Sequence, residues 1–288
     1  LPICQRARVL NSVLVALQPD YSIKLRRAPD WREACTQAWG APAADAGVQV
    51  LTLRELTGVV GAHEWRKKGV DMPLLGKNAR IHPHYGVFSP VRGEYVAMVH
   101  EAPLAFGMRE LAFDIGTGTG VLAALLAKRG VKRVVATDTS SRALACAQEN
   151  IERLGVSDKV ELQQTSLFPE GQAPLIVCNP PWVPARAVTT LEQAVYDENS
   201  TMLRGFLSGL REHLSPDGEG WLVLSDLAEH LGLRSRDELM GWIDAAGLYV
   251  VYRMDAEPTH GKAQDSSDPL HAARSAEVTS LWRLKAKV

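Results

Sequence analysis

The stretch that decides the fold is Phe113-Asp-Ile-Gly-Thr-Gly-Thr-Gly120, in which an apolar run leads into three glycines at alternate positions. Glycine has no Cβ, so such a turn can adopt positive φ and lie close against a ligand. Residues 121–129 follow with helical spacing, and the first N–H groups of a helix are open to an acceptor. The stretch therefore predicts a strand, a glycine-rich turn and a helix that together bind a cofactor.

Strand and helix patterns alternate along the chain after this turn. Strands are predicted at 111–115, 133–137, 160–164, 175–178 and 221–224. Helical spacing is found at 121–129, 142–154, 201–214 and 236–246. This alternation predicts a parallel sheet covered by helices on both faces. Two further strands, 249–254 and 278–284, have no helix between them and are expected to pair antiparallel.

The spacing of the glycines favours one cofactor over another. It is G-x-G-x-G, whereas dinucleotide-binding turns have G-x-G-x-x-G. This difference favours S-adenosyl-L-methionine, which has no pyrophosphate, over NAD. Asp138 ends the next strand, where its carboxylate can accept both hydrogens of a ribose diol. Asp114 is expected to orient the turn or to meet the methionine ammonium group.

The reaction is indicated by Cys178-Asn-Pro-Pro-Trp182, directly after the fourth predicted strand. This motif resembles the one in methyltransferases that act on base amines or on glutamine side-chain amides. In this interpretation the Asn179 oxygen and the Pro180 carbonyl accept the hydrogens of a planar NH₂ group, and Trp182 stacks on it. Pro180 and Pro181 stiffen the loop. The alternative is that Asn-Pro-Pro forms only a turn.

A third motif is Tyr85-Gly-Val-Phe-Ser-Pro90. With the two others it resembles HemK-type release-factor glutamine methyltransferases and the "small" ribosomal-RNA guanine methyltransferases, over about residues 80–226. The resemblance implies a class I Rossmann-like α/β fold, with a doubly wound sheet of seven strands, mostly parallel, whose last strand is antiparallel. The expected cofactor-binding residues are Phe88, Pro90, Asp114, Gly116, Thr117, Gly118, Thr119, Gly120, Asp138, Thr139, Ser166, Leu167 and Asn179.

The chain departs from these families at three places. Pro90-Val-Arg-Gly-Glu94 differs from the HemK-type continuation, and Trp182 stands where that family usually has Tyr. Ser166 stands where these families often have an Asp that contacts the adenine amine. A release-factor substrate is therefore not implied, and RNA, DNA and protein glutamine all remain as acceptors. Two other functions compete: a non-catalytic S-adenosylmethionine-binding subunit, and a nicotinamide-dependent oxidoreductase.

The front of the chain differs from the remainder in charge and pattern. Residues 1–90 carry 12 Lys and Arg against 7 Asp and Glu, whereas residues 91–288 carry 20 against 26. Helical spacing at 6–17 and 31–39, a further apolar segment at 48–56 and an irregular stretch at 61–92 predict a small, mainly helical N-terminal module followed by a lid. We expect this module, 1–90, to select the acceptor, and 91–288 to be the catalytic domain.

The candidates for acceptor recognition within the module are basic side chains: Arg26, Arg27 and Arg32, and Arg66, Lys67 and Lys68 beside Trp65. Such a cluster can set cations and an aromatic face against a base or an acidic loop. A solvated helix face is the alternative. Residues 255–276 are expected to form either a substrate-side loop or a connector.

Several classes of protein are excluded by composition. The chain is 46% hydrophobic and 23% charged, which is typical of a globular protein rather than a disordered one. Its four cysteines are far apart and its histidines do not cluster, so we expect reduced thiols, a cytoplasmic location and no metal. The apolar run at 9–17 is shorter than the ~20 residues that cross a bilayer, so no membrane contact is expected. The oligomeric state stays open.

Overall fold

The computed structural model describes residues 3–43, 45–91, 93–186, 195–257, 273 and 275–287. Most of the predicted loop at 255–276 therefore lies outside the described residues. Among those that are described, no helix is both long and apolar enough to cross a membrane.

The centre of the fold is a seven-stranded sheet with the order β10-β11-β9-β8-β5-β6-β7. β11 runs antiparallel to both of its neighbours, whereas β9, β8, β5, β6 and β7 are parallel. This confirms the predicted α/β fold with its antiparallel last strand. The strands are β5 (Leu111–Ile115), β6 (Arg133–Asp138), β7 (Val160–Gln164), β8 (Ala173–Cys178), β9 (Leu214–Ser225), β10 (Leu248–Ala256) and β11 (Thr279–Ala286).

Helices connect the parallel strands in two directions. From β5 the chain proceeds to β6 and β7, and from β8 it proceeds the opposite way to β9 and β10. Because such crossovers are right-handed, the two sets of helices cover opposite faces of the sheet. The helices are α4 (Glu94–Glu101), α5 (Val121–Lys128), α6 (Ser141–Arg153), α8 (Thr201–His213), α9 (Leu227–His230) and α10 (Arg236–Ala245). Short 3₁₀ helices, η2 (Phe106–Arg109) and η3 (Glu198–Ser200), precede β5 and α8.

The reversal of direction between β5 and β8 locates the site. In open α/β sheets, ligands bind outside the carboxyl ends of the strands, where the strand order changes direction. The glycine turn follows β5 and the Asn-Pro-Pro-Trp motif follows β8, so both lie at this point. The strands beneath them are buried, with Phe113, Ile115, Ile176 and Cys178 at most 2% exposed.

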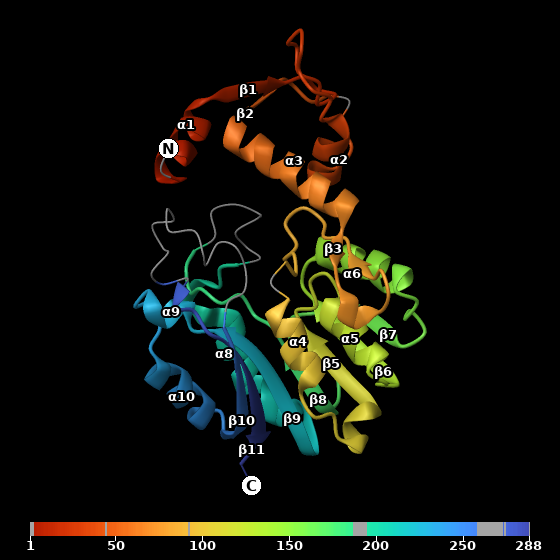
Figure 1. Cartoon of the computed structure of the whole chain (residues 1–288), viewed down its shortest axis with the longest axis vertical. Coiled ribbons are helices and arrows are strands. Elements are labelled where there is room, and N and C mark those ends of the chain that lie inside the picture. Colours follow the sequence, from red (N-terminus) through yellow and green to blue (C-terminus); the bar gives the residue numbers. More distant parts are fainter. Residues whose placement is uncertain are drawn as a thin grey trace.

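The N-terminal module lies above this domain in Figure 1 and has a small core of its own, which includes Leu17, Cys35 and Leu56. Its β1 and β2 pair antiparallel, as do β3 and β4 farther along. Val70, Met72, Leu75 and Ile81 pack in the larger core instead. The boundary at residue 90 stays a prediction. The elements are α1 (Ile3–Ser12), β1 (Leu14–Leu17), α2 (Arg32–Trp39), β2 (Gln49–Thr52), α3 (Leu53–Lys68), β3 (Val70–Asp71), η1 (Pro73–Leu75) and β4 (Arg80–Ile81).

Three predictions for the front of the chain were wrong. The helix expected at 6–17 ends at Ser12, because Leu14–Leu17 pairs with β2. The segment 48–56 is a strand followed by a helix start, since the Thr52 side chain accepts the N–H of Glu55 and caps α3. The stretch expected to be irregular from residue 61 continues α3 to Lys68, and α4 was not predicted.

Candidate active site

The three glycines of the turn all have positive φ: 69° at Gly116, 54° at Gly118 and 78° at Gly120. Residues with a side chain rarely adopt this conformation. A Cβ on Gly120 would lie 3.1 Å from Cβ and 3.2 Å from Cα of Ala147 on α6, so the turn also packs tightly against that helix. The sequence pattern therefore predicted the turn and its backbone conformation correctly.

Asp114 holds the turn from below. It is 1% exposed, and its Oδ2 accepts the hydroxyl of Thr117 at 2.6 Å and the backbone N–H of Ala123 at 3.1 Å. Burial raises the pKa of this carboxyl to about 6, and the carboxylate of Asp138 adds to the rise. Of the two roles predicted for Asp114, the contacts support orientation of the turn.

Asp138 lies at the end of β6 and already contributes to the turn. Its Oδ2 accepts the N–H of Gly118 at 3.0 Å, and its Oδ1 accepts the N–H of Ser140 at 2.9 Å. A carboxylate has about four lone-pair sites, so both oxygens can still accept a ribose hydroxyl. Thr139 and Ser166 are exposed at the ends of the neighbouring strands.

Leu167 adopts a positive φ of 61°, and its carbonyl accepts the hydroxyl of Thr137 at 2.6 Å. This bond ties the loop after β7 to β6. The predicted cofactor residues on three neighbouring strands are thus brought to one edge of the sheet, although their contacts with a cofactor stay a prediction.

The Asn-Pro-Pro-Trp motif is ordered by a contact that its spacing did not predict. Nε1 of Trp182 donates a hydrogen bond to Oδ1 of Asn179 at 2.9 Å. The indole is 9% exposed, and its ring centroid lies 6.5 Å from that of Phe88. Asn179 is half-buried and Pro180 is buried. The geometry thus supports a first role for Trp182 in orienting Asn179, and the predicted stacking on the acceptor stays a prediction.

The segment 85–90 lies over the glycine turn. A Cβ on Gly118 would be 3.9 Å from Cγ1 of Val87, and Phe88 packs between Trp182 and Tyr95. Pro90 is buried. The segment therefore joins the glycine turn to the Asn-Pro-Pro-Trp motif.

Asp197 was missed by the sequence reasoning. Its carboxylate accepts the N–H groups of Met202 at 2.9 Å and Leu203 at 3.1 Å, and its own N–H donates to the carbonyl of Val183 at 2.9 Å. It therefore anchors the start of α8 to the end of the Asn-Pro-Pro-Trp loop. A Cβ on Gly116 would collide with Cε of Met202, so α8 also abuts the glycine turn.

The backbone between Asp197 and α8 is strained. Asn199 and Ser200 both have left-handed φ, 58° and 53°. Consecutive residues with side chains rarely adopt this conformation, and such strain is concentrated at functional sites. No local pattern in the sequence marks either residue as strained.

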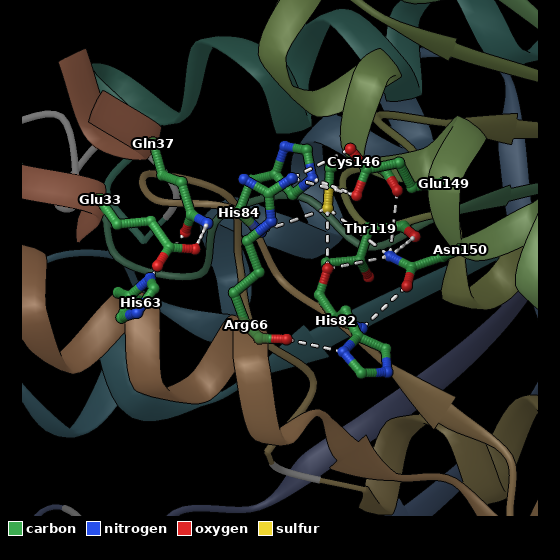
Figure 2. Close-up of polar contacts among 10 residues, drawn as sticks. All are labelled: Glu33, Gln37, His63, Arg66, His82, His84, Thr119, Cys146, Glu149 and Asn150. Carbon is green, nitrogen blue, oxygen red and sulfur yellow. Dashed lines mark hydrogen bonds and ion pairs between the residues drawn. The ribbon is translucent and has the colours of Figure 1, made fainter. Parts of the chain in front are cut away.

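The prediction that Arg66 belongs to an acceptor-recognising cluster needs a correction, because its guanidinium pairs with Glu149. Its Nη2 lies 3.0 Å from Oε1 and 3.1 Å from Oε2 of Glu149 on α6, so this guanidinium joins α3 to the catalytic domain (Figure 2). Lys67 and Lys68 are exposed, and Nζ of Lys68 lies 5.6 Å from the ring centroid of Trp65, which is 42% exposed. Arg66 is therefore engaged in an ion pair within the chain. Its partner lies 83 residues away, so no local pattern could reveal this contact.

Comparison with protein-family models places this domain. Residues 78–236, more than half of the chain, match the model of the methyltransferase small domain. The chain belongs to the methyltransferase small domain family. This membership confirms the resemblance based on the three motifs, and it makes S-adenosyl-L-methionine the cofactor of the domain.

Curated relatives of this methyltransferase domain act on different acceptors. The chain is 35% identical over 187 residues to a release factor glutamine methyltransferase of Thermosynechococcus vestitus, covering 59% of this chain and 60% of the relative. It is 33% identical over 151 residues to a ribosomal protein uL3 glutamine methyltransferase of Bordetella pertussis, covering 48% and 51%. It is 30% identical over 174 residues to a tRNA1(Val) (adenine(37)-N6)-methyltransferase of Parabacteroides distasonis, covering 58% and 73%. The chain spans about half the length of the first two kinds of relative.

Solved structures show the same fold at lower identity. A ribosomal protein L11 methylase from Lactobacillus delbrueckii subsp. bulgaricus has a TM-score of 0.50 and 22% identity, covering 76% of this chain and 91% of that one. A geranyl diphosphate methyltransferase solved with sinefungin has a TM-score of 0.52 and 12% identity, covering 69% and 80%. At these identities the likeness shows the class I methyltransferase fold alone.

The residues at the carboxyl edge of this methyltransferase domain fit S-adenosylmethionine. Asp138 offers carboxylate oxygens for a diol, and the positive-φ glycines expose backbone to a ligand. Ser89, in the segment over the turn, has a buried Oγ without a hydrogen-bond partner in the described part of the chain. Such an orphaned hydroxyl is a ready partner for a bound polar ligand. The described residues contain no cluster of His, Cys, Asp or Glu that could hold a metal ion.

The raised pKa of Asp114 predicts a pH-dependent stability. The ordinary value is 3.8, so the unfolded chain ionises first and unfolding releases a proton between that pH and about 6. The contribution of the protonated carboxyl is complete below pH 3.8 and is lost as pH rises through about 6. Without cofactor, the free energy of unfolding of Asp114→Asn minus that of the native chain should rise by roughly 2 kcal/mol between pH 4 and pH 7. Urea unfolding at several pH values measures this difference, and a flat difference would contradict the burial argument.

Proposed function

We propose that this chain transfers a methyl group from S-adenosylmethionine to a planar amino or amide nitrogen of a macromolecule. The observation that carries the proposal is the Asn179–Trp182 hydrogen bond in the loop after β8, beside the glycine turn after β5. S-adenosylmethionine supplies an electrophilic methyl group when bound.

Asn179 is suited to hold the acceptor by its hydrogens. A carbonyl oxygen accepts two hydrogen bonds, and the indole N–H of Trp182 uses one lone pair of Oδ1. The second lone pair, with the Pro180 carbonyl, can accept the N–H groups of an amide or aromatic amine. An acceptor held by its hydrogens keeps its nitrogen free to react. Because the indole fixes the Asn179 amide, the loop is organised before the acceptor arrives.

The surroundings of the loop limit the access of water to this contact. Phe88 and Trp182 pack together above the sheet, and Pro180 is buried. A hydrogen bond to Asn179 in such a setting is stronger than one exposed to solvent. The loop therefore provides orientation and electrostatic stabilisation, and needs no covalent intermediate.

The acceptor is proposed to be a macromolecule recognised partly by residues 1–90. The relatives named above act on a release factor, a ribosomal protein or a tRNA. The exposed group of Trp65, Lys67 and Lys68 is a candidate contact for an acidic protein loop or for nucleic acid. We place the activity in the cytoplasm, where the free thiols of Cys35, Cys146 and Cys178 stay reduced.

Methyl transfer into an extract of the encoding organism tests this proposal and identifies the acceptor. With labelled S-adenosylmethionine, the purified chain should place label in the macromolecular fraction. Release of the label by nuclease identifies nucleic acid, and release by protease identifies protein. If calorimetry shows cofactor binding but no label is transferred, the result would instead support a non-catalytic S-adenosylmethionine-binding subunit. No observation in the structure favours that alternative. The Asn179→Ala chain is the control for contaminating activity.

A further inference from the structure

One face of α6 binds a segment that is distant in sequence. Glu149 and Asn150 lie three and four residues after Cys146, so both side chains lie near that of Cys146 on the helix surface. Each contacts the segment 82–84: the backbone N–H of His84 donates to Sγ of Cys146 at 3.3 Å, and Nε2 of His84 lies 3.0 Å from Oε2 of Glu149. Figure 2 shows these side chains converging between α3 and α6.

Asn150 makes the densest set of these contacts. It is fully buried, and its Oδ1 accepts the backbone N–H of His82 at 2.8 Å. Its Nδ2 lies within hydrogen-bonding distance of three carbonyl oxygens, those of Thr119 at 3.1 Å, Cys146 at 3.1 Å and His82 at 3.3 Å, which share its two hydrogens. A single amide thereby joins the segment 82–84 to the glycine turn.

The contact with Thr119 bears directly on the cofactor turn. Thr119 lies between two glycines with positive φ, Gly118 and Gly120, so its backbone has few local restraints of its own. A buried carbonyl in such a turn needs a partner, because an unpaired buried polar group is costly. The Asn150 amide is one such partner, and it therefore helps to set the orientation of the peptide that Thr119 shares with Gly120.

The segment 82–84, which Asn150 holds, continues into the residues that lie over the glycine turn. Four residues after His84, Phe88 packs against Trp182 and Tyr95. At its other side the segment is held by α3, since Nδ1 of His82 donates to the carbonyl of Arg66 at 2.6 Å. The position of the segment therefore affects both the glycine turn and the aromatic cover above it.

We propose that Asn150 is a positioning residue for the cofactor: through the Thr119 carbonyl and the His82 backbone, it holds the glycine turn and the covering segment in the arrangement that binds S-adenosylmethionine. This proposal rests on the proposed function, because it assumes that the cofactor is S-adenosylmethionine. It assigns Asn150 no contact with the cofactor itself.

Cofactor affinity in Asn150 variants tests this role. Asn150→Asp keeps the acceptor for the His82 N–H but replaces the donor toward Thr119 with a carboxylate oxygen. Asn150→Ser removes the same donor without adding charge. We expect the Kd for S-adenosylmethionine, measured by calorimetry on the folded protein, to rise at least ~10-fold in each variant, as for the loss of a buried hydrogen bond. Glu149→Gln on the same face, which leaves Thr119 untouched, should change it less than ~3-fold.

A purely structural role would give a different result. It would lower the free energy of unfolding of the Asn150 variants in urea while leaving the Kd of the folded fraction within ~2-fold of the native value, and this outcome would overturn the proposal. If neither variant folds, hydrogen exchange in the native chain decides. By reciprocity, saturating S-adenosylhomocysteine should slow exchange of the His82 amide, and unchanged exchange would reject the coupling. Because none of these measurements needs an acceptor, their failure is distinguishable from a failure of methyl transfer.

Discussion

Asn179→Ala is expected to bind S-adenosylmethionine within about twofold of the native affinity while methyl transfer falls by roughly 100-fold or more, as for loss of one oriented hydrogen-bonding group in an active site. The reason is that Oδ1 is proposed to hold the acceptor nitrogen, whereas the turn after β5 and Asp138 are proposed to make the main contacts with the cofactor. The penalty should therefore appear in kcat with the natural acceptor. Calorimetry and single-turnover transfer of labelled methyl measure the two quantities separately.

Trp182→Phe is the matched control for this prediction. It keeps an aromatic ring against Phe88 but removes the indole N–H that donates to Asn179. The Asn179 oxygen remains, only less well oriented, so the loss should be smaller, roughly 10-fold. Near-normal turnover in Asn179→Ala would reject the amine-methylation mechanism. An equal loss in both variants would show that the orientation of the amide, rather than the acceptor contact, limits the reaction.

The central sheet could be predicted because its signals are local. β5 and β7 have the bounds that the sequence predicted, and the glycine turn has the conformation that its spacing indicated. Parallel strands buried on both faces carry continuous apolar runs, which need no partner to be recognised. The location of the Asn-Pro-Pro-Trp motif followed in the same way from the strand that precedes it.

The contacts that organise the site could not be predicted, because they depend on residues far apart in sequence. Arg66 and Glu149 are 83 residues apart, and His82 and Asn150 are 68 apart. Arg66 in particular precedes two exposed lysines, Lys67 and Lys68, so its local pattern indicated a surface cation. Only the packing of α3 beside α6 shows that Arg66 forms an ion pair with another helix of the same chain.

A short separation in sequence did not by itself make a contact predictable, because a side chain can have more than one candidate partner. Trp182 and Asn179 are three residues apart, yet the motif alone suggested that the indole would stack on the acceptor. A buried indole N–H needs an acceptor, and the Asn179 oxygen is the one that supplies it. The same requirement, applied at the start, would have favoured the orienting role.

Gly120→Ala is expected to destabilise the chain by roughly 3 kcal/mol, the sum of the ~1–2 kcal/mol cost of a left-handed residue with a side chain and a similar cost of overpacking. The φ of Gly120 is 78°, and its new Cβ would lie 3.1 Å from Cβ, 3.2 Å from Cα and 3.4 Å from the carbonyl oxygen of Ala147. Two of these atoms are helix backbone, which cannot rotate away as a flexible side chain would. Either α6 or the turn must move.

Gly155→Ala isolates the conformational part of this cost. Gly155 has a similar φ of 66°, but a Cβ there would meet no atom within 4 Å. It should therefore lose only the ~1–2 kcal/mol of the left-handed conformation and keep its cofactor affinity. Urea unfolding gives the two stabilities, and calorimetry gives the two Kd values. Equal effects at both positions would show that Ala147 yields easily and that packing against α6 does not shape the turn.

The cofactor affinity of Gly120→Ala should fall at least ~10-fold, because the displaced elements are the ones that carry the site. Ala147 lies on α6 between Cys146 and Asn150, and Asn150 bonds the carbonyl of Thr119 immediately before Gly120. A shift of α6 away from residue 120 therefore stretches the bond to residue 119. The alanine side chain at position 120 would thus disturb the glycine turn in two ways, by direct contact with α6 and through the hydrogen bond of the Asn150 amide.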